Sequence, residues 1–139
     1  MRWIKRGLIV FVGLILVLIG ALTINHFVEQ TQIRNFYAAR PILSAMNQAA
    51  MQASDDTKEP GSSAWAQAVL EARAPAGTLR NDVVRMLAAE DVVCTPTRDS
   101  GNGLVCGVKD APPVIFNWHI ELGFDGNDRL AQTRVLILK

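Results

Sequence analysis

An uninterrupted apolar segment lies near the start of the chain. Residues 7–24 carry no charged side chain. At about 1.5 Å per residue, a helix of this length spans ~27 Å, close to the hydrocarbon thickness of a bilayer. A soluble domain in a chain of 139 residues needs no such helix for its core. The pattern therefore predicts a transmembrane helix over residues 7–25.

The flanks of this segment indicate its orientation. Arg2, Lys5 and Arg6 precede it, and the next basic residue is Arg34. Positive charge stays on the cytoplasmic side of a membrane segment, so residues 1–6 are predicted to be cytoplasmic and the rest of the chain to lie outside. A cleaved signal peptide is the alternative. Its apolar region is normally only about 7–15 residues long, so we predict that the segment is retained as an anchor.

Helical periodicity continues beyond the apolar segment. Apolar residues recur at helical spacing: Phe36, Leu43, Met46 and Ala50. Pro41 should kink or restart this helix, because proline has no N–H to donate. We predict a helical stalk over residues 26–53 and a polar linker, rich in turn formers, over residues 54–63.

Two further helices are predicted at the start of a compact domain over residues 64–139. The first follows Ser63, a good capping residue, and its expected apolar face is Trp65, Ala68, Val69 and Ala72. The second begins near Leu79. One side of it carries Leu79, Val83, Met86, Leu87 and Glu90.

Strand patterns follow these helices. Residues 92–95 and 104–108 are β-branched runs separated by turn-forming residues, which predicts a hairpin that brings Cys94 opposite Cys106. The chain has only these two cysteines. They are expected to form a structural disulfide in an oxidising compartment, for which the periplasm fits best. A redox pair is disfavoured, because eleven residues lie between them instead of the two of a catalytic dithiol.

The clearest strand lies over residues 116–124. Large apolar residues alternate there with polar ones or glycine: Phe116, Trp118, Ile120, Leu122 and Phe124. A period of two indicates one buried face and one wetter face. After a turn, residues 130–138 return as a strand with Ala131, Thr133, Val135 and Ile137 on one side. The fold class is therefore α+β, a two-layer domain of two helices packed on a three- to four-stranded antiparallel sheet.

Two short motifs carry a family resemblance. Gly77, Val83 and Leu87 match a helix motif written Gly-Met-Thr-x-x-Gln-Val-x-x-x-Leu-Gly-x-Pro. The chain departs from the motif at Leu79, Ala88 and Glu90, among other positions; the motif has Thr, Gly and Pro at these three. Residues 124–130 resemble a hairpin written Phe-Asp-x-x-Gly-x-Leu, with Asp128 in place of the glycine.

These motifs resemble the SmpA/BamE-like envelope domain and the related β-lactamase-inhibitor-protein-like modules over residues 64–138. The resemblance implies the fold and a non-enzymatic character. It does not imply an outer-membrane assembly role, because no cysteine follows the apolar segment to carry a lipid anchor.

Candidate chemistry is sparse. His119 and Glu121 share a strand face, but the other histidine, His26, lies at the membrane boundary, so a zinc site lacks ligands. The acidic turn at residues 125–128 lacks the twelve-residue loop of a calcium site. Without Arg2, Lys5 and Arg6 the chain has 11 basic and 13 acidic residues, which argues against a nucleic-acid surface. We expect no metal, no cofactor and no small-molecule substrate.

Three classes of function are weighed on these grounds. The favoured one is a single-pass inner-membrane protein whose periplasmic domain binds another envelope protein or steadies a complex, through the strand face of Asn117, His119 and Glu121 or through the sheet edge. The alternative is a minor pilin-like or secretion-system subunit, which the residues after Gly7 disfavour because no acid interrupts the apolar run. An enzyme is disfavoured by the residue inventory.

Overall fold

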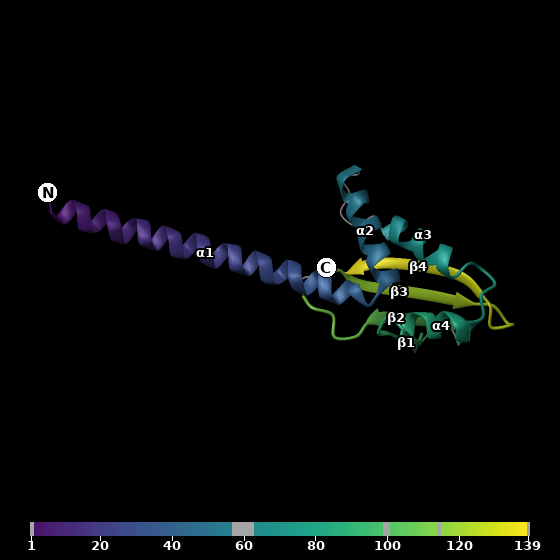
Figure 1. The fold of residues 1–139 in the computed structure, drawn as a ribbon. Helices are drawn as coiled ribbons and strands as arrows, with labels where there is room; N and C mark the ends of the chain where they lie inside the picture. Colours follow the sequence, from purple (N-terminus) through teal and green to yellow (C-terminus); the bar gives the residue numbers. More distant parts are fainter. Residues whose placement is uncertain (1, 57–62, 99–100, 114, 139) are drawn as a thin grey trace. The chain divides into compact units, whose positions relative to one another are not determined.

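The computed structural model describes residues 2–56, 63–98, 101–113 and 115–138, and of residues 2–11 and 53–56 it describes only the backbone. The chain divides into two compact units between Asn35 and Phe36. The described residues form four helices and a four-stranded antiparallel sheet, so the fold is α+β (Figure 1).

The first helix contains the predicted anchor. Helix α1 covers Arg2–Ala38, and its part Val12–Ala38 has a mean hydropathy of 1.9 over the most apolar window, which is not buried. Aliphatic side chains along it are exposed, among them Val17 and Leu22. By length and composition this helix is compatible with a single-pass membrane anchor.

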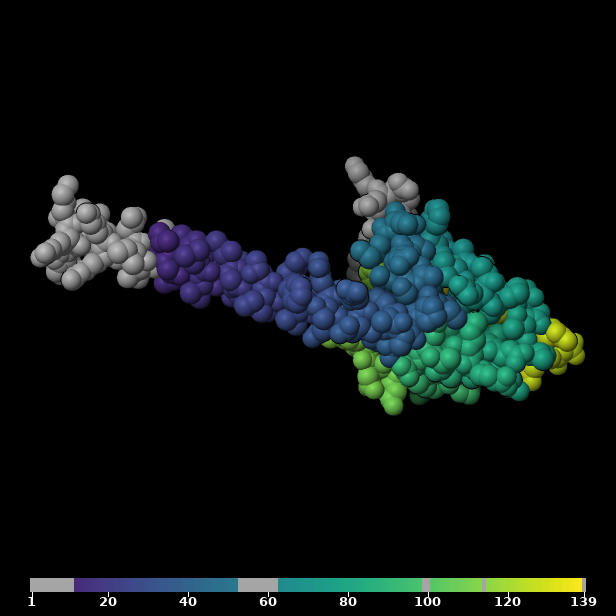
Figure 2. Space-filling view, viewed as in Figure 1, coloured from purple at the N-terminus to yellow at the C-terminus, as the bar shows by residue number. Residues whose placement is uncertain are grey.

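The second unit begins earlier than the sequence predicted. Helix α2 covers Pro41–Asp56 and starts with proline at its first position, where the missing N–H costs nothing. The predicted apolar seam is present and buried: Phe36, Leu43, Met46 and Ala50. It packs within the folded unit, and α2 contacts α3 (Figure 2, blue and teal). The residues from Phe36 onward, predicted as part of a helical stalk, are helical but belong to the folded unit, and this seam is part of its core.

Helix α3 covers Ser63–Arg73, and it buries a different face from the one predicted. Ala66 and Leu70 are fully buried, whereas Trp65 is 55% exposed and Ala68 and Ala72 are exposed as well. The buried stripe follows the four-residue spacing of the helix and continues at Ala74. Most of the linker predicted over residues 54–63, namely 57–62, lies outside the described residues.

Helix α4 covers Arg80–Ala88 and buries Val83 and Leu87 of the predicted side. Leu79, also predicted on this side, lies just before the helix and is 45% exposed. It is followed by strands β1, Val92–Pro96, and β2, Gly103–Val108, which pair as the expected hairpin. Strands β3, Asn117–Phe124, and β4, Leu130–Leu138, complete the sheet in the order β1-β2-β3-β4 (Figure 1). Helix α3 contacts β4, and α4 contacts β1.

Alternation along β3 divides the sheet into two faces. Trp118, Ile120, Leu122 and Phe124 are buried, as predicted, and define the inner face. Phe116, predicted to belong to the same strand, lies just before it and is half-buried. We call the opposite side, with Asn117, His119 and Glu121, the outer face. Strand β4 follows the same division only from Thr133 onward. The pairing shifts at Gly123/Phe124, so that Leu130 is buried and Ala131, predicted to lie on the same side as Thr133, is exposed.

A side chain of α3 takes up part of the hydrogen-bonding capacity of the free edge of β4. The backbone N–H of Val135 points away from β3 and donates to Oε1 of Gln67 at 3.4 Å. An unpaired strand edge can pair with another chain, and covering it with a helix is a common protection. Strand β1, at the other end of the sheet, has no strand beside it among the described residues.

Candidate functional site

The structure brings two of the three predicted interaction residues together. His119 and Glu121 lie two positions apart on the outer face of β3, and Nε2 of His119 is 3.3 Å from Oε1 of Glu121. The second carboxylate oxygen of Glu121 is 3.6 Å from Nη1 of Arg134, its neighbour on β4. Asn117 lies at the start of β3, opposite Leu138. The outer face therefore carries a short charged row next to an amide.

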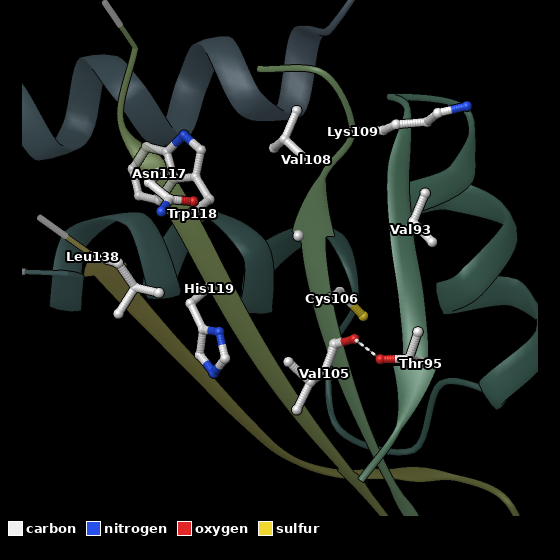
Figure 3. A pocket seen from close by; sticks show the side chains of 11 residues that line it. Val93, Thr95, Val105, Cys106, Val108, Lys109, Asn117, Trp118, His119 and Leu138 are labelled. Atoms are coloured by element: carbon white, nitrogen blue, oxygen red, sulfur yellow. Dashed lines mark hydrogen bonds between the residues drawn. The ribbon is translucent and has the colours of Figure 1, made fainter. Parts of the chain in front are cut away.

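A shallow depression lies beside this row. Its volume is about 600 Å³, and it opens on the outer face over β1, β2 and the start of β3 (Figure 3). In the register of the sheet, Gly107 lies between Val93 on β1 and His119 on β3. Because glycine has no side chain, the outer face is recessed at this position. The walls are largely apolar: Val93, Val105, Val108 and Leu138. Val93 and Leu138 are 51% and 45% exposed.

The charge of the depression is one-sided. Lys109 is the only lysine, arginine, aspartate or glutamate among its lining residues, and Thr95, Asn117 and His119 add hydrogen-bonding groups. Figure 3 shows Lys109 beside Val93, at the β1 side, and Leu138 near Asn117 at the β4 side. Glu121 is not a lining residue, and its carboxylate is engaged by His119 and Arg134. The lining therefore suits a partner group that is apolar with a nearby negative charge.

The functional groups of this face are few and partly exposed. His119 and Glu121 are within hydrogen-bonding reach of each other, and of the two only His119 lines the open depression. Within the described part of the chain, no cluster of three or more histidine, cysteine, aspartate or glutamate side chains could hold a metal ion. The arrangement can provide contact area, hydrogen bonds and charge.

The cysteines lie directly below this surface. Cys94 and Cys106 are opposite each other on β1 and β2, and their sulfur atoms are 2.07 Å apart, which is bonding distance. Cys106 is fully buried. The predicted pairing across a hairpin is confirmed, and the bond joins the two strands that carry Val93 and Gly107.

The buried carboxylate of Glu90 holds the start of α2, a role that the sequence did not reveal. Glu90 is 3% exposed, and its two oxygens accept the backbone N–H groups of Ile42 and Leu43, both at 2.7 Å. These N–H groups belong to the first turn of α2 and have no partner inside the helix. A signal was present, because Glu90 continues the buried stripe of Val83 and Leu87.

Arg40 completes this cluster. Its guanidinium donates to the backbone oxygens of Phe36, at 2.6 Å, and Glu90, at 3.2 Å, and forms an ion pair with Asp91. It also stacks on the Phe36 ring, 4.2 Å from the centroid. The last turn of α1, the start of α2 and the corner between α4 and β1 are thereby joined. We call these residues, Phe36, Arg40, Glu90 and Asp91, the corner cluster.

Two pKa shifts accompany the fold. Burial raises the pKa of the Tyr37 hydroxyl, and the nearby Trp118 indole partly opposes this rise. Neither the Tyr37 hydroxyl nor Trp118 Nε1 makes a hydrogen bond of good geometry. In the turn before β4, the backbone N–H groups of Arg129 and Asn127 hold the pKa of Asp125 below its usual range. Trp118 belongs to the inner face of the sheet, and Asp125 lies in the turn between β3 and β4.

No protein-family description, no curated protein and no solved structure matches this chain. The likeness to SmpA/BamE-like domains therefore stays a prediction from its two motifs.

Proposed function

We propose that this chain is a single-pass inner-membrane protein with a cytoplasmic N-terminus. Its folded unit lies in the periplasm and binds another envelope protein through the outer face of the sheet. In this arrangement the helices form one layer on the inner face of the sheet and leave the outer face free. The role is to hold or stabilise a complex, and it involves no chemical conversion.

The exposure of the outer face is the observation that carries this proposal. Val93 and Leu138 are half-exposed on either side of a shallow depression, next to a row of polar and charged groups. Apolar patches rimmed by polar groups are typical of protein-interaction sites. The openness of the depression favours a protein surface over a small ligand, which needs most of its area buried.

The anchor and the disulfide support the proposed location. Helix α1 is apolar over a length that spans a bilayer, and three basic residues, Arg2, Lys5 and Arg6, precede its apolar run. The Cys94–Cys106 bond persists in oxidising compartments such as the periplasm. A phosphatase reporter fused after Lys139 is expected to be active only outside the cytoplasm. Activity of a cytoplasmic reporter at the same position would contradict the orientation.

Site-specific crosslinking in intact cells tests the interaction. A photo-reactive amino acid is placed at Thr95 on the outer face of β1, which is exposed. Arg85 on α4, whose side chain is 81% exposed, is the matched control position. The proposal expects one discrete adduct from position 95 and none from position 85. Equal labelling at both positions, or no adduct at 95, would overturn it.

A further inference from the structure

The depression on the outer face is a built feature of the sheet, and its shape has one cause. Gly107 stands in register between Val93 and His119, on strands that both carry side chains toward this face. A Cβ atom at Gly107 would meet only the backbone oxygen of Trp118, at 3.7 Å, which is an ordinary contact. The space above Gly107 is therefore not required for the sheet to form, and a larger side chain there would fill the depression from below.

The size of the depression suits side chains that another protein presents. Its volume is about 600 Å³, but it is open to solvent along the outer face. An open cavity buries one or two apolar side chains well and a free small molecule poorly. The neighbouring Val93, Val105 and Leu138 offer contacts for an aliphatic or aromatic side chain.

The charges around the depression select among such partners. Lys109 carries the only formal charge in the lining, and its side chain lies beside Val93 (Figure 3). Glu121, which lies on the same face, has its carboxylate engaged by His119 and Arg134. Asn117 and Glu121 lie four residues apart on β3, about 13 Å along a strand, so the end of the depression near Asn117 is far from that negative charge. A carboxylate of the partner would be attracted to the Lys109 side and would meet no repulsion from the lining.

We infer that the depression around Gly107 binds a segment of a partner protein that places an apolar side chain between Val93 and Leu138 and an adjacent aspartate or glutamate against Lys109. This inference rests on the proposed interaction function and names the chemistry of the partner. The apolar side chain supplies affinity, and the carboxylate supplies orientation.

A displayed library of random heptapeptides provides the probe. It is selected against the full chain, reconstituted in nanodiscs of neutral lipid. The expected result is enrichment of peptides in which an aromatic or aliphatic residue lies next to Asp or Glu. Enrichment of peptides without acidic residues, or no enrichment, would overturn the inference.

Two variants connect the binding to the site. Gly107→Val is expected to lower the affinity for the enriched peptides by about tenfold or more, because the new side chain occupies the space of one apolar side chain of the partner. Gly123→Val is the matched control: this outer-face glycine of β3 lies outside the depression, and an added Cβ meets Gln132 at 3.5 Å, an ordinary contact. Equal binding by both variants would refute the location.

Lys109→Glu tests the charge without depending on the packing of the sheet, because Lys109 is exposed. This variant is expected to bind acidic peptides with about fivefold lower affinity and to enrich lysine- or arginine-containing peptides from the library instead. Unchanged selectivity would refute the assigned role of Lys109.

The cellular crosslinking experiment separates this inference from the proposed function. Adducts at position 95 to a protein that does not compete with the acidic peptides would leave the proposed function standing and overturn the inference. Adducts only to a second copy of this chain would overturn the assigned partner as well. Competition between the peptides and the crosslinked partner supports both.

Discussion

The Glu90 carboxylate accepts the backbone N–H of Leu43 at 2.7 Å, across 47 positions of the chain. The other oxygen of Glu90 accepts the N–H of Ile42. A capping residue normally lies directly before its helix, but here the cap of α2 comes from the turn between α4 and β1. Helix α2 is therefore tied to the rest of the folded unit at its first turn, where fraying would otherwise begin.

Removal of this cap should be costly. Glu90→Ala leaves two buried N–H groups without an acceptor, so we expect the free energy of unfolding to fall by about 2–3 kcal/mol. Urea unfolding of the purified protein measures the change. Glu71→Ala, an exposed glutamate on α3, serves as the control and should alter stability by less than about 0.5 kcal/mol. A loss below ~1 kcal/mol for Glu90→Ala would show that the first turn finds other partners.

The two faces of β3 should respond differently to substitution. Trp118 is 1% exposed, and Trp118→Ala should cost about 3–5 kcal/mol, as expected for removal of a large buried aromatic. The double variant His119→Ala with Glu121→Ala should cost less than about 1 kcal/mol, because both side chains are partly exposed. Thermal melts of the two variants decide this. A double variant as unstable as Trp118→Ala would mean that the outer face is needed for folding.

The disulfide should contribute substantially to a unit of this size. It closes a loop with a sequence separation of 12, and its loss should lower stability by about 2–4 kcal/mol. Urea unfolding of wild type, with and without reductant, is compared with Cys94→Ser, which should no longer respond to reductant. If thiol reagents label the unreduced, unfolded wild-type protein quantitatively, the bond is absent from the isolated material.

Asp125 should make stability depend on pH in the acidic range. The backbone N–H groups of Arg129 and Asn127 lower its folded pKa below the unfolded value. The contribution of this carboxylate is therefore complete above the unfolded pKa, near pH 4, and is lost as pH falls through the folded pKa. An NMR titration should place the pKa of Asp125 below the usual value of an aspartate. As the pH falls from above the unfolded pKa through the folded pKa, the melting temperature of Asp125→Asn should fall less than that of wild type.

Much of the fold was predictable because its patterns are local. The apolar segment, the β1–β2 hairpin and the alternation around Trp118 each follow from neighbours in the sequence. The same holds for Val83 and Leu87 on α4. These predictions needed no knowledge of which element packs against which.

The errors have a common cause in packing over long distances. The apolar seam with Leu43 and Met46 was visible in the sequence. Nothing local showed that α2 packs against α3, which buries this seam, and does not form a free stalk. Trp65 has a strong apolar preference, yet the buried stripe of α3 is set by Ala66 and Leu70. The depression depends on the register of three strands around Gly107, and the sequence predicts the strands but not their exact alignment.

The Gln67 contact with the edge of β4 limits how these molecules can associate. Open-ended polymers built by strand pairing need two free edges on every sheet, one to receive and one to donate. Strands β1 and β4 are both edge strands of the described sheet, and Gln67 of α3 accepts one N–H group of the β4 edge, that of Val135. A strand that adds to β4 must first displace this side chain, so edge pairing is hindered at β4.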